Sequence, residues 1–90
     1  MKAKPGFILR KIVGEYMLLP IDENIRTYNG AVLLNSVSAF VWEQLQSEAS
    51  REELLARMLE EFDVDEATAA RDLDALLNKL REMELLEEQN

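Results

Sequence analysis

The 90-residue sequence contains neither cysteine nor histidine. Without cysteine, the chain can form no disulfide and no thiolate metal site. Without histidine, it can hold no Ser-His or Cys-His nucleophile pair and no imidazole metal site. Carboxylates remain as acid–base groups, but they fall mostly at positions expected to face solvent on helices. We therefore expect no catalytic residue, no metal site and no cofactor, in a protein that is not an enzyme.

Glycine and long apolar runs are also scarce. The three glycines are isolated from one another, so the chain lacks a glycine-rich phosphate loop. No apolar run approaches the roughly 20 residues that cross a bilayer. Residues 1–11 lack the apolar core of a signal peptide. We expect a cytoplasmic protein with no membrane partner.

Charge is distributed unevenly along the chain, whose formal net charge is −8. Residues 1–42 carry five basic and three acidic side chains, whereas residues 43–90 carry five basic and fifteen acidic ones. Either the acidic side chains simply solvate helices, or the two halves face different partners. In both cases the phosphates that dominate nucleic-acid affinity would repel this chain, so we expect no nucleic-acid partner.

The first part of the sequence predicts a β-hairpin. Two apolar runs, residues 7–13 and 16–21, flank Gly14-Glu15, a pair typical of a type II′ turn. Pro20 has no backbone N–H to donate, so it should mark the end of the second strand or a bulge. The polar stretch 22–30 that follows predicts a loop.

The spacing of apolar residues changes abruptly at Asn35. Residues 31–34 form a short apolar run typical of a third strand, whereas the apolar residues after Asn35 recur at helical spacing. The Asn35 side chain can accept a hydrogen bond from a free backbone N–H, which favours it as an N-cap, with Ser36 as the alternative. Asn35 should therefore end a strand and begin a helix over residues 36–46 without a linker.

Two further helices are predicted, over residues 51–62 and 66–83. Ser50 and Glu53 form a capping box before the first, and Asp65 is the cap of the second. Apolar residues on each recur three, four and seven apart, as on one buried face. We predict that these side chains are buried together in the core: Phe40, Trp42, Leu54, Leu73, Leu76 and Leu80. Trp42 could instead be a stacking platform, but its neighbours favour the core.

The predicted order is βββααα, an α+β fold with a three-stranded antiparallel meander followed by three helices. We expect one domain over residues 1–90. The strands are apolar on both faces, which is more than a half-solvated sheet needs. An edge strand in such a sheet offers unpaired N–H and C=O groups. Either the edges are short and harmless, or one of them accepts a peptide strand.

Three segments carry a resemblance to a known family: "GFILRKIVGEYMLLP", "NGAVLLNSVSAFVWEQL" and "EEFDVDEATAARDLDALLNKLREMELL". Together they resemble the pyrroloquinoline quinone biosynthesis protein D (PqqD) family over nearly the whole chain. The resemblance implies a winged helix-turn-helix-like fold and a role in recognising the leader segments of ribosomally made, post-translationally modified peptides. It implies that the leader adds as a strand beside the third strand, against the third helix. The complex is then presented to a modifying enzyme, often a radical S-adenosylmethionine enzyme.

Two flanks of the third helix could face such a peptide. One contains Thr68, Asp72, Ala75 and Lys79, and the other contains Ala70, Asp74 and Arg81. We favour the first because the small Ala75 leaves room for a peptide side chain, although alanine is also simply a good helix former. The predicted peptide-binding residues are Ala31, Val32, Leu33, Leu34, Thr68, Asp72, Ala75, Leu76 and Lys79. Tyr28, in the loop before the third strand, either gates that edge or anchors the loop.

Two alternatives to peptide binding stay open. The chain could be a winged-helix transcription regulator, or a small subunit that docks on a larger enzyme. The first is disfavoured because a DNA-reading helix needs net positive charge. The third helix instead carries more acidic than basic residues.

Overall fold

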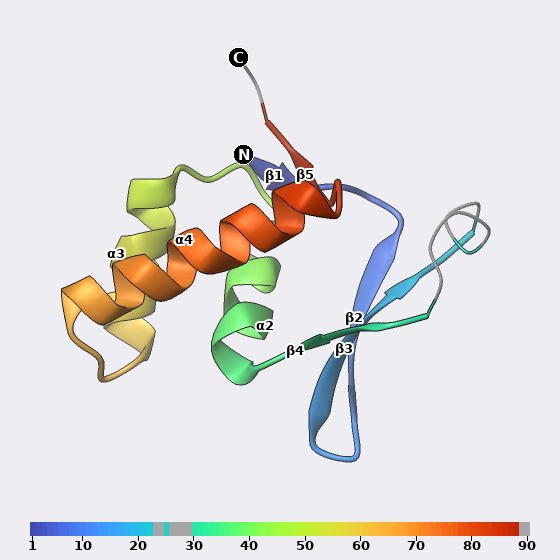
Figure 1. Cartoon of the computed structure of the whole chain (residues 1–90), viewed down its shortest axis with the longest axis horizontal. Coiled ribbons are helices and arrows are strands. Elements are labelled where there is room, and N and C mark those ends of the chain that lie inside the picture. The colour runs from blue at the N-terminus through green and yellow to red at the C-terminus, as the bar shows by residue number, and fades with distance from the viewer. Residues whose placement is uncertain (23–24, 26–29, 89–90) are drawn as a thin grey trace.

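The computed structural model describes residues 1–22, 25 and 30–88. Its main sheet is antiparallel with the strand order β2-β3-β4 (Figure 1). Strands β2 (Phe7–Ile12) and β3 (Glu15–Pro20) form a hairpin. Strand β4 (Val32–Leu34) pairs with β3 alone and so lies at an edge. This confirms the three-stranded meander, and Pro20 is the last residue of β3, as predicted.

The hairpin turn lies one residue earlier than predicted. Ile12 pairs with Glu15, so the two-residue loop is Val13-Gly14, and these residues have φ angles of +50° and +79°. Positive φ at both positions defines a type I′ turn, and the predicted type II′ turn at Gly14-Glu15 was wrong. A β-branched residue in the left-handed region is strained by about 1–2 kcal/mol. Val13 was assigned to the strand because of its high β-propensity.

Three helices follow the sheet, which confirms the βββααα order. They are α2 (Ser36–Gln44), α3 (Arg51–Glu61) and α4 (Glu66–Glu82). They lie to one side of the sheet in Figure 1, and they approach it chiefly where α2 meets β4. Within the residues that the structure describes, no helix is long and apolar enough to span a membrane.

Each helix begins at the predicted cap. The Asn35 side chain accepts a hydrogen bond from the backbone N–H of Ser38 at 2.8 Å, so β4 passes into α2 without a linker. Ser50 forms the predicted capping box of α3. Asp65 accepts from the N–H of Thr68 at 2.7 Å and starts α4. These caps satisfy backbone donors that the first helical turn leaves free.

Helix α4 ends in a Schellman motif. The Leu85 N–H donates to the Leu80 carbonyl at 2.8 Å, and the Glu84 N–H donates to the Arg81 carbonyl at 3.0 Å. Glu84 has a φ of +59°, the left-handed conformation that this motif requires after the last helical residue. Leu80 and Leu85 are both fully buried, which supplies the apolar contact that accompanies the motif.

The chain then forms a second, smaller sheet that the sequence did not predict. Strand β5 (Leu86–Glu87) pairs antiparallel with β1 (Lys2–Ala3). Glu87 pairs with Lys2, and Leu86 pairs with Ala3. The two segments lie far apart in sequence, and neither shows an alternating pattern long enough to identify a strand.

The core joins one face of the main sheet to all three helices. Leu18 and Leu34 enter it from the strands, and Trp42 from α2 is 2% exposed. Of the six predicted core residues, five are buried, and Phe40 is half-buried. The Phe40 ring packs edge-to-face on Phe62 with 5.3 Å between the centroids. Trp42 is therefore a core residue rather than a stacking platform.

Replacing Trp42 with alanine should lower the free energy of unfolding by roughly 3–5 kcal/mol, because it leaves a large cavity in a packed core. Urea denaturation followed by far-ultraviolet circular dichroism measures this difference. Trp42→Phe should cost clearly less. A loss below about 1 kcal/mol for the alanine variant, in the range of surface substitutions, would contradict the position of Trp42 in the core.

Candidate peptide-binding pocket

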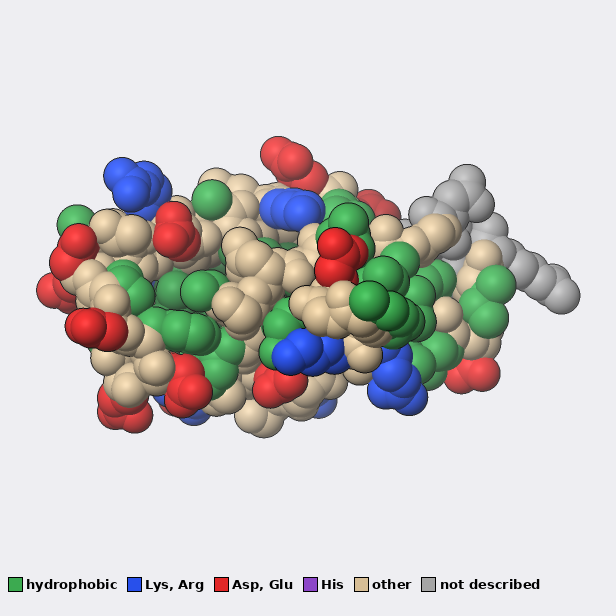
Figure 2. Space-filling view, turned by 90° about the horizontal axis from the view of Figure 1, so that it is seen from below, with side chains coloured by type: hydrophobic (Ala, Val, Ile, Leu, Met, Phe, Trp, Pro, Cys, Tyr) green, Lys and Arg blue, Asp and Glu red, His purple; other side chains and the backbone are tan. Residues whose placement is uncertain are grey.

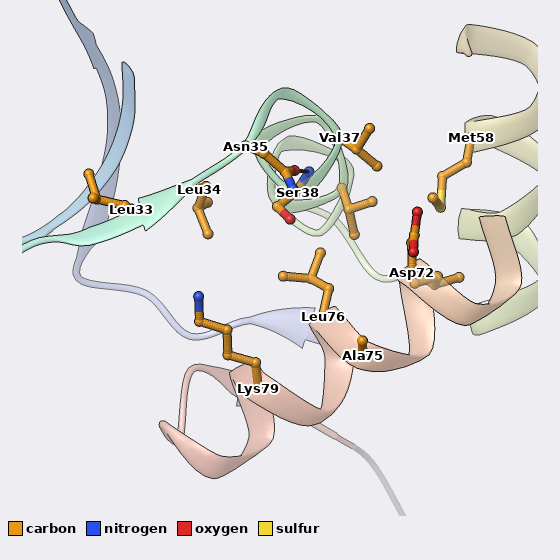
Figure 3. A pocket seen from close by; sticks show the side chains of 12 residues that line it. Leu33, Leu34, Asn35, Val37, Ser38, Met58, Asp72, Ala75, Leu76 and Lys79 are labelled. Carbon is orange, nitrogen blue, oxygen red and sulfur yellow. Dashed lines mark hydrogen bonds between the residues drawn. The ribbon is translucent and has the colours of Figure 1, made fainter. Parts of the chain in front are cut away.

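A pocket of about 350 Å³ lies between the end of β4 and α4 (Figure 3). One wall is the strand edge with the first turns of α2, and the other is a face of α4. Met58 contributes from α3 at one end. The residues that line the pocket are Leu33, Leu34, Asn35, Val37, Ser38, Val41, Met58, Asp72, Leu73, Ala75, Leu76 and Lys79.

The register of the sheet determines which backbone groups of β4 face outward. The Ile21 N–H donates to the Gly6 carbonyl at 2.9 Å, and the two-residue turn closes with the Ile12–Glu15 pair. Ile21 and Glu15 therefore direct their backbone groups toward β2. Along a strand, residues that face one neighbouring strand alternate with residues that face the other, so Tyr16 and Leu18 direct their backbone groups toward β4. Their partners there are Leu34 and Val32.

Leu33 lies between these two partners, so its N–H and C=O point away from β3. Within the described residues, neither group makes a backbone hydrogen bond outside the sheet. The Leu33 side chain is 57% exposed, so neither water nor another chain is excluded from this position. The edge therefore offers one donor and one acceptor to an added strand.

The pocket is apolar in the middle and charged at both ends. Leu34 and Leu76 are buried at its floor, and Leu76 projects between the two walls (Figure 3). Asp72 lies near Met58 at one end, and Lys79 extends toward β4 at the other. In the part of the chain that the structure describes, neither charged side chain makes a hydrogen bond or an ion pair. Both charges are therefore available to a ligand.

The opposite flank of α4 is engaged within the fold. The Arg51 guanidinium donates two hydrogen bonds to the Asp74 carboxylate, at 2.6 and 2.9 Å, and thereby links the start of α3 to α4. These bonds hold the pKa of Asp74 below its usual value. Arg81 donates to Glu88 at 2.6 Å. The pocket thus lies on the first of the two flanks distinguished in the sequence.

Six of the nine predicted site residues line the pocket, and three do not. Ala31 is exposed just before β4, and Val32 is half-buried at its first position. Thr68 donates both its N–H and its hydroxyl to Asp65, so its role is in the cap of α4. Tyr28 lies outside the described residues.

Sequence reasoning missed several lining residues. Val37 and Ser38 belong to the first turn of α2, which follows β4 directly. The absence of a linker at Asn35 was the signal that could have placed them near the strand edge. Met58 is buried on α3, and no local sequence pattern indicates that this part of α3 reaches the pocket.

A shallower depression of about 310 Å³ continues the groove toward the hairpin turn. It shares Leu33, Leu34 and Asn35 with the main pocket and adds Gly14, Glu15 and Tyr16. A ligand at the β4 edge can therefore extend past the end of the strand.

The fold and pocket together define a small α+β domain in which an open strand edge faces a helix across an apolar groove. The profile of the family described as "Coenzyme PQQ synthesis protein D (PqqD)" matches residues 15–86. The chain belongs to this family, which confirms the resemblance found in the sequence.

Two solved structures are similar over nearly their whole length. One is described as TbiB1 in complex with the TbiA(beta) leader peptide. It is 28% identical, with a TM-score of 0.74, and the match covers 100% of this chain and 99% of that one. The other is described as lasso peptide synthetase B1 complexed with the leader peptide. It is 20% identical, with a TM-score of 0.71, covering 97% of this chain and 96% of that one. No curated protein shows a significant match.

The Asp74–Arg51 pair should make part of the stability depend on pH. Because the folded state lowers the Asp74 pKa, the stabilisation is present above the ordinary carboxyl pKa and is lost as pH falls through the folded value. Asp74→Asn should therefore lower the urea midpoint at neutral pH, and the difference from the native sequence should shrink on acidification. Asp72→Asn, which removes an unpaired carboxylate, is the matched control. A midpoint difference for Asp74→Asn that stays constant with pH would contradict this assignment.

Proposed function

We propose that this chain is a non-catalytic peptide-binding module that binds the leader segment of a precursor peptide by strand addition. The leader pairs with the open edge of β4 and lies against α4. The complex is then presented to a modifying enzyme. The observation that carries this proposal is the position of the pocket, which is bounded on one side by an unpaired strand edge and on the other by α4.

Strand addition explains why the pocket needs no catalytic group. The outward N–H and C=O of Leu33 pair with the main chain of the peptide, which supplies affinity independently of its sequence. Alternate side chains of the peptide then face the groove. The apolar floor at Leu34 and Leu76 favours an aliphatic or aromatic side chain there.

The charged ends of the groove favour one orientation of the peptide. Asp72 and Lys79 are seven residues apart on α4, which corresponds to about 10 Å along the helix axis. A peptide with a basic residue near Asp72 and an acidic residue near Lys79 places both charges favourably. The reversed peptide places like charges together at both ends, which disfavours it.

The two structural relatives, by their descriptions, hold leader peptides, and this supports the same class of ligand here. From the family resemblance we take the modifying enzyme to be of the radical S-adenosylmethionine type. A role as a DNA-binding regulator is less well supported. The exposed acidic residues Asp72, Asp74 and Glu82 on α4 would face the phosphates of a duplex bound by that helix.

Replacing Ala75 with leucine should weaken binding of the leader by about tenfold or more, because the larger side chain fills the groove beside Leu76. Leucine is a good helix former, so α4 should stay folded. The ligand is a fluorescein-labelled leader segment of a candidate precursor peptide, chosen from the short open reading frames that flank this chain's gene. Fluorescence anisotropy gives the dissociation constant, and circular dichroism confirms the fold.

Ala67→Leu is the matched control, because Ala67 is exposed on the first turn of α4 and does not line the pocket. It should bind the leader as the native sequence does. Equal affinities for the native sequence and both variants would place the peptide elsewhere. Absence of leader binding by the native sequence would overturn the proposed function itself.

A further inference from the structure

The face of the main sheet that points away from the core is apolar. Residues alternate between the two faces of a strand, and the register places Ile8, Ile12, Met17, Leu19 and Leu33 together on this outer face. None of the five belongs to the core or packs against it. The solvated face of an antiparallel sheet is normally polar, so this composition requires another explanation.

The exposed apolar residues of this surface lie toward the tip of the hairpin, whereas Ile8, Met17 and Leu19 are half-buried. Ile12 is 44% exposed, Leu33 is 57% exposed and Val13 is 97% exposed. Val13 also occupies the left-handed φ position where a type I′ turn favours asparagine or glycine. The tip therefore carries two unfavourable features at one residue, backbone strain and an exposed apolar side chain. Such strain concentrates at functional positions, and exposed apolar patches mark interaction surfaces.

The outer face carries one charge of each sign, Glu15 opposite Ile12 at the hairpin end and Arg10 opposite Met17. Arg10 lies on the outer face between Ile8 and Ile12, opposite Met17. Its guanidinium donates only to the neighbouring Leu9 carbonyl and forms no ion pair within the described residues. Figure 2, seen from the hairpin end, shows hydrophobic side chains gathered beside both basic and acidic ones. An acidic group on a partner would complement Arg10, whereas most carboxylates of this acidic chain lie within residues 43–90.

We propose that the outer face of β2-β3-β4 and the Val13 tip dock the chain onto the peptide-modifying enzyme, at an apolar surface that presents a carboxylate to Arg10. This inference rests on the proposed function. The leader is assigned to the edge of β4, so the outer face stays free when the peptide is bound. Leu33 connects the two sites, because its backbone faces the groove edge and its side chain lies on the outer face. An enzyme docked here therefore lies beside the bound leader.

The test uses the full chain, its leader peptide and a purified candidate modifying enzyme, chosen from the genes that flank this chain's gene. Val13→Asn replaces the exposed apolar side chain with the residue that a type I′ turn prefers, so the fold should be kept or stabilised. Biolayer interferometry should show enzyme association weakened by about tenfold or more, as when an interface anchor is lost. Anisotropy should show unchanged leader binding.

Two more variants sharpen the test. Arg10→Glu should slow association with the enzyme, and raised salt should reduce the difference from the native sequence. Ile25→Asn is the control, because Ile25 is another exposed apolar residue and lies in the β3–β4 connection, at the opposite end of the sheet from the hairpin tip. It should change enzyme affinity by less than about twofold, as expected away from an interface.

Three results would overturn the docking surface, and leader binding is measured separately in each case. The first is equal enzyme affinity for Val13→Asn and the native sequence, and the second is no association of the native sequence with the enzyme. The third is a native chain that self-associates in sedimentation and that Val13→Asn dissociates. The last result would assign the face to a second copy of this chain. Loss of leader binding in the native sequence would instead count against the proposed function.

Discussion

Strand β4 and helix α2 meet at Asn35 with no intervening loop, and the position of the pocket depends on that joint. The cap bond from Ser38 to the Asn35 side chain starts α2 directly after the buried Leu34. The direction of α2 is therefore coupled to the end of the strand. Its first turns then bring Val37 and Val41 beside the strand edge, where they line the pocket. A flexible linker at this point would separate the edge from the helical wall.

The opposite wall of the pocket is held by contacts that lie outside it. Helix α4 is capped by Asp65 at its start and ends in the Schellman motif at Glu84. The bidentate Arg51–Asp74 pair links its outer flank to α3. Asp72 and Lys79 are consequently not needed for the fold and remain available to a ligand. This separation of structural and available charges along one helix is what a binding surface requires.

Local chemistry made much of this fold predictable. The caps at Asn35, Ser50 and Asp65, and the buried stripe of α4, depend on residues within one or two turns of each other, and the structure confirms them. The hairpin turn was misplaced because the β-propensity of Val13 conflicts with its positive φ. The pairing of β1 with β5 joins opposite ends of the sequence and leaves no local signal.

The candidate site was likewise predictable only where it depends on local sequence. Asp72, Ala75 and Lys79 could be grouped because helical spacing places them on one flank. Met58 could not be found, because its place in the pocket depends on how α3 packs against α4. Thr68 was assigned to the binding flank by spacing alone, whereas its hydrogen bonds place it in a cap.

The central claim is that a peptide strand pairs with the open edge of β4, and amide hydrogen exchange at Leu33 tests it most directly. In the free protein the Leu33 N–H points away from β3, so it should exchange faster than the N–H groups of Val32 and Leu34. A saturating leader peptide should slow exchange at Leu33 strongly and at its two neighbours much less. Unchanged exchange at Leu33, while anisotropy shows the peptide bound, would contradict strand addition.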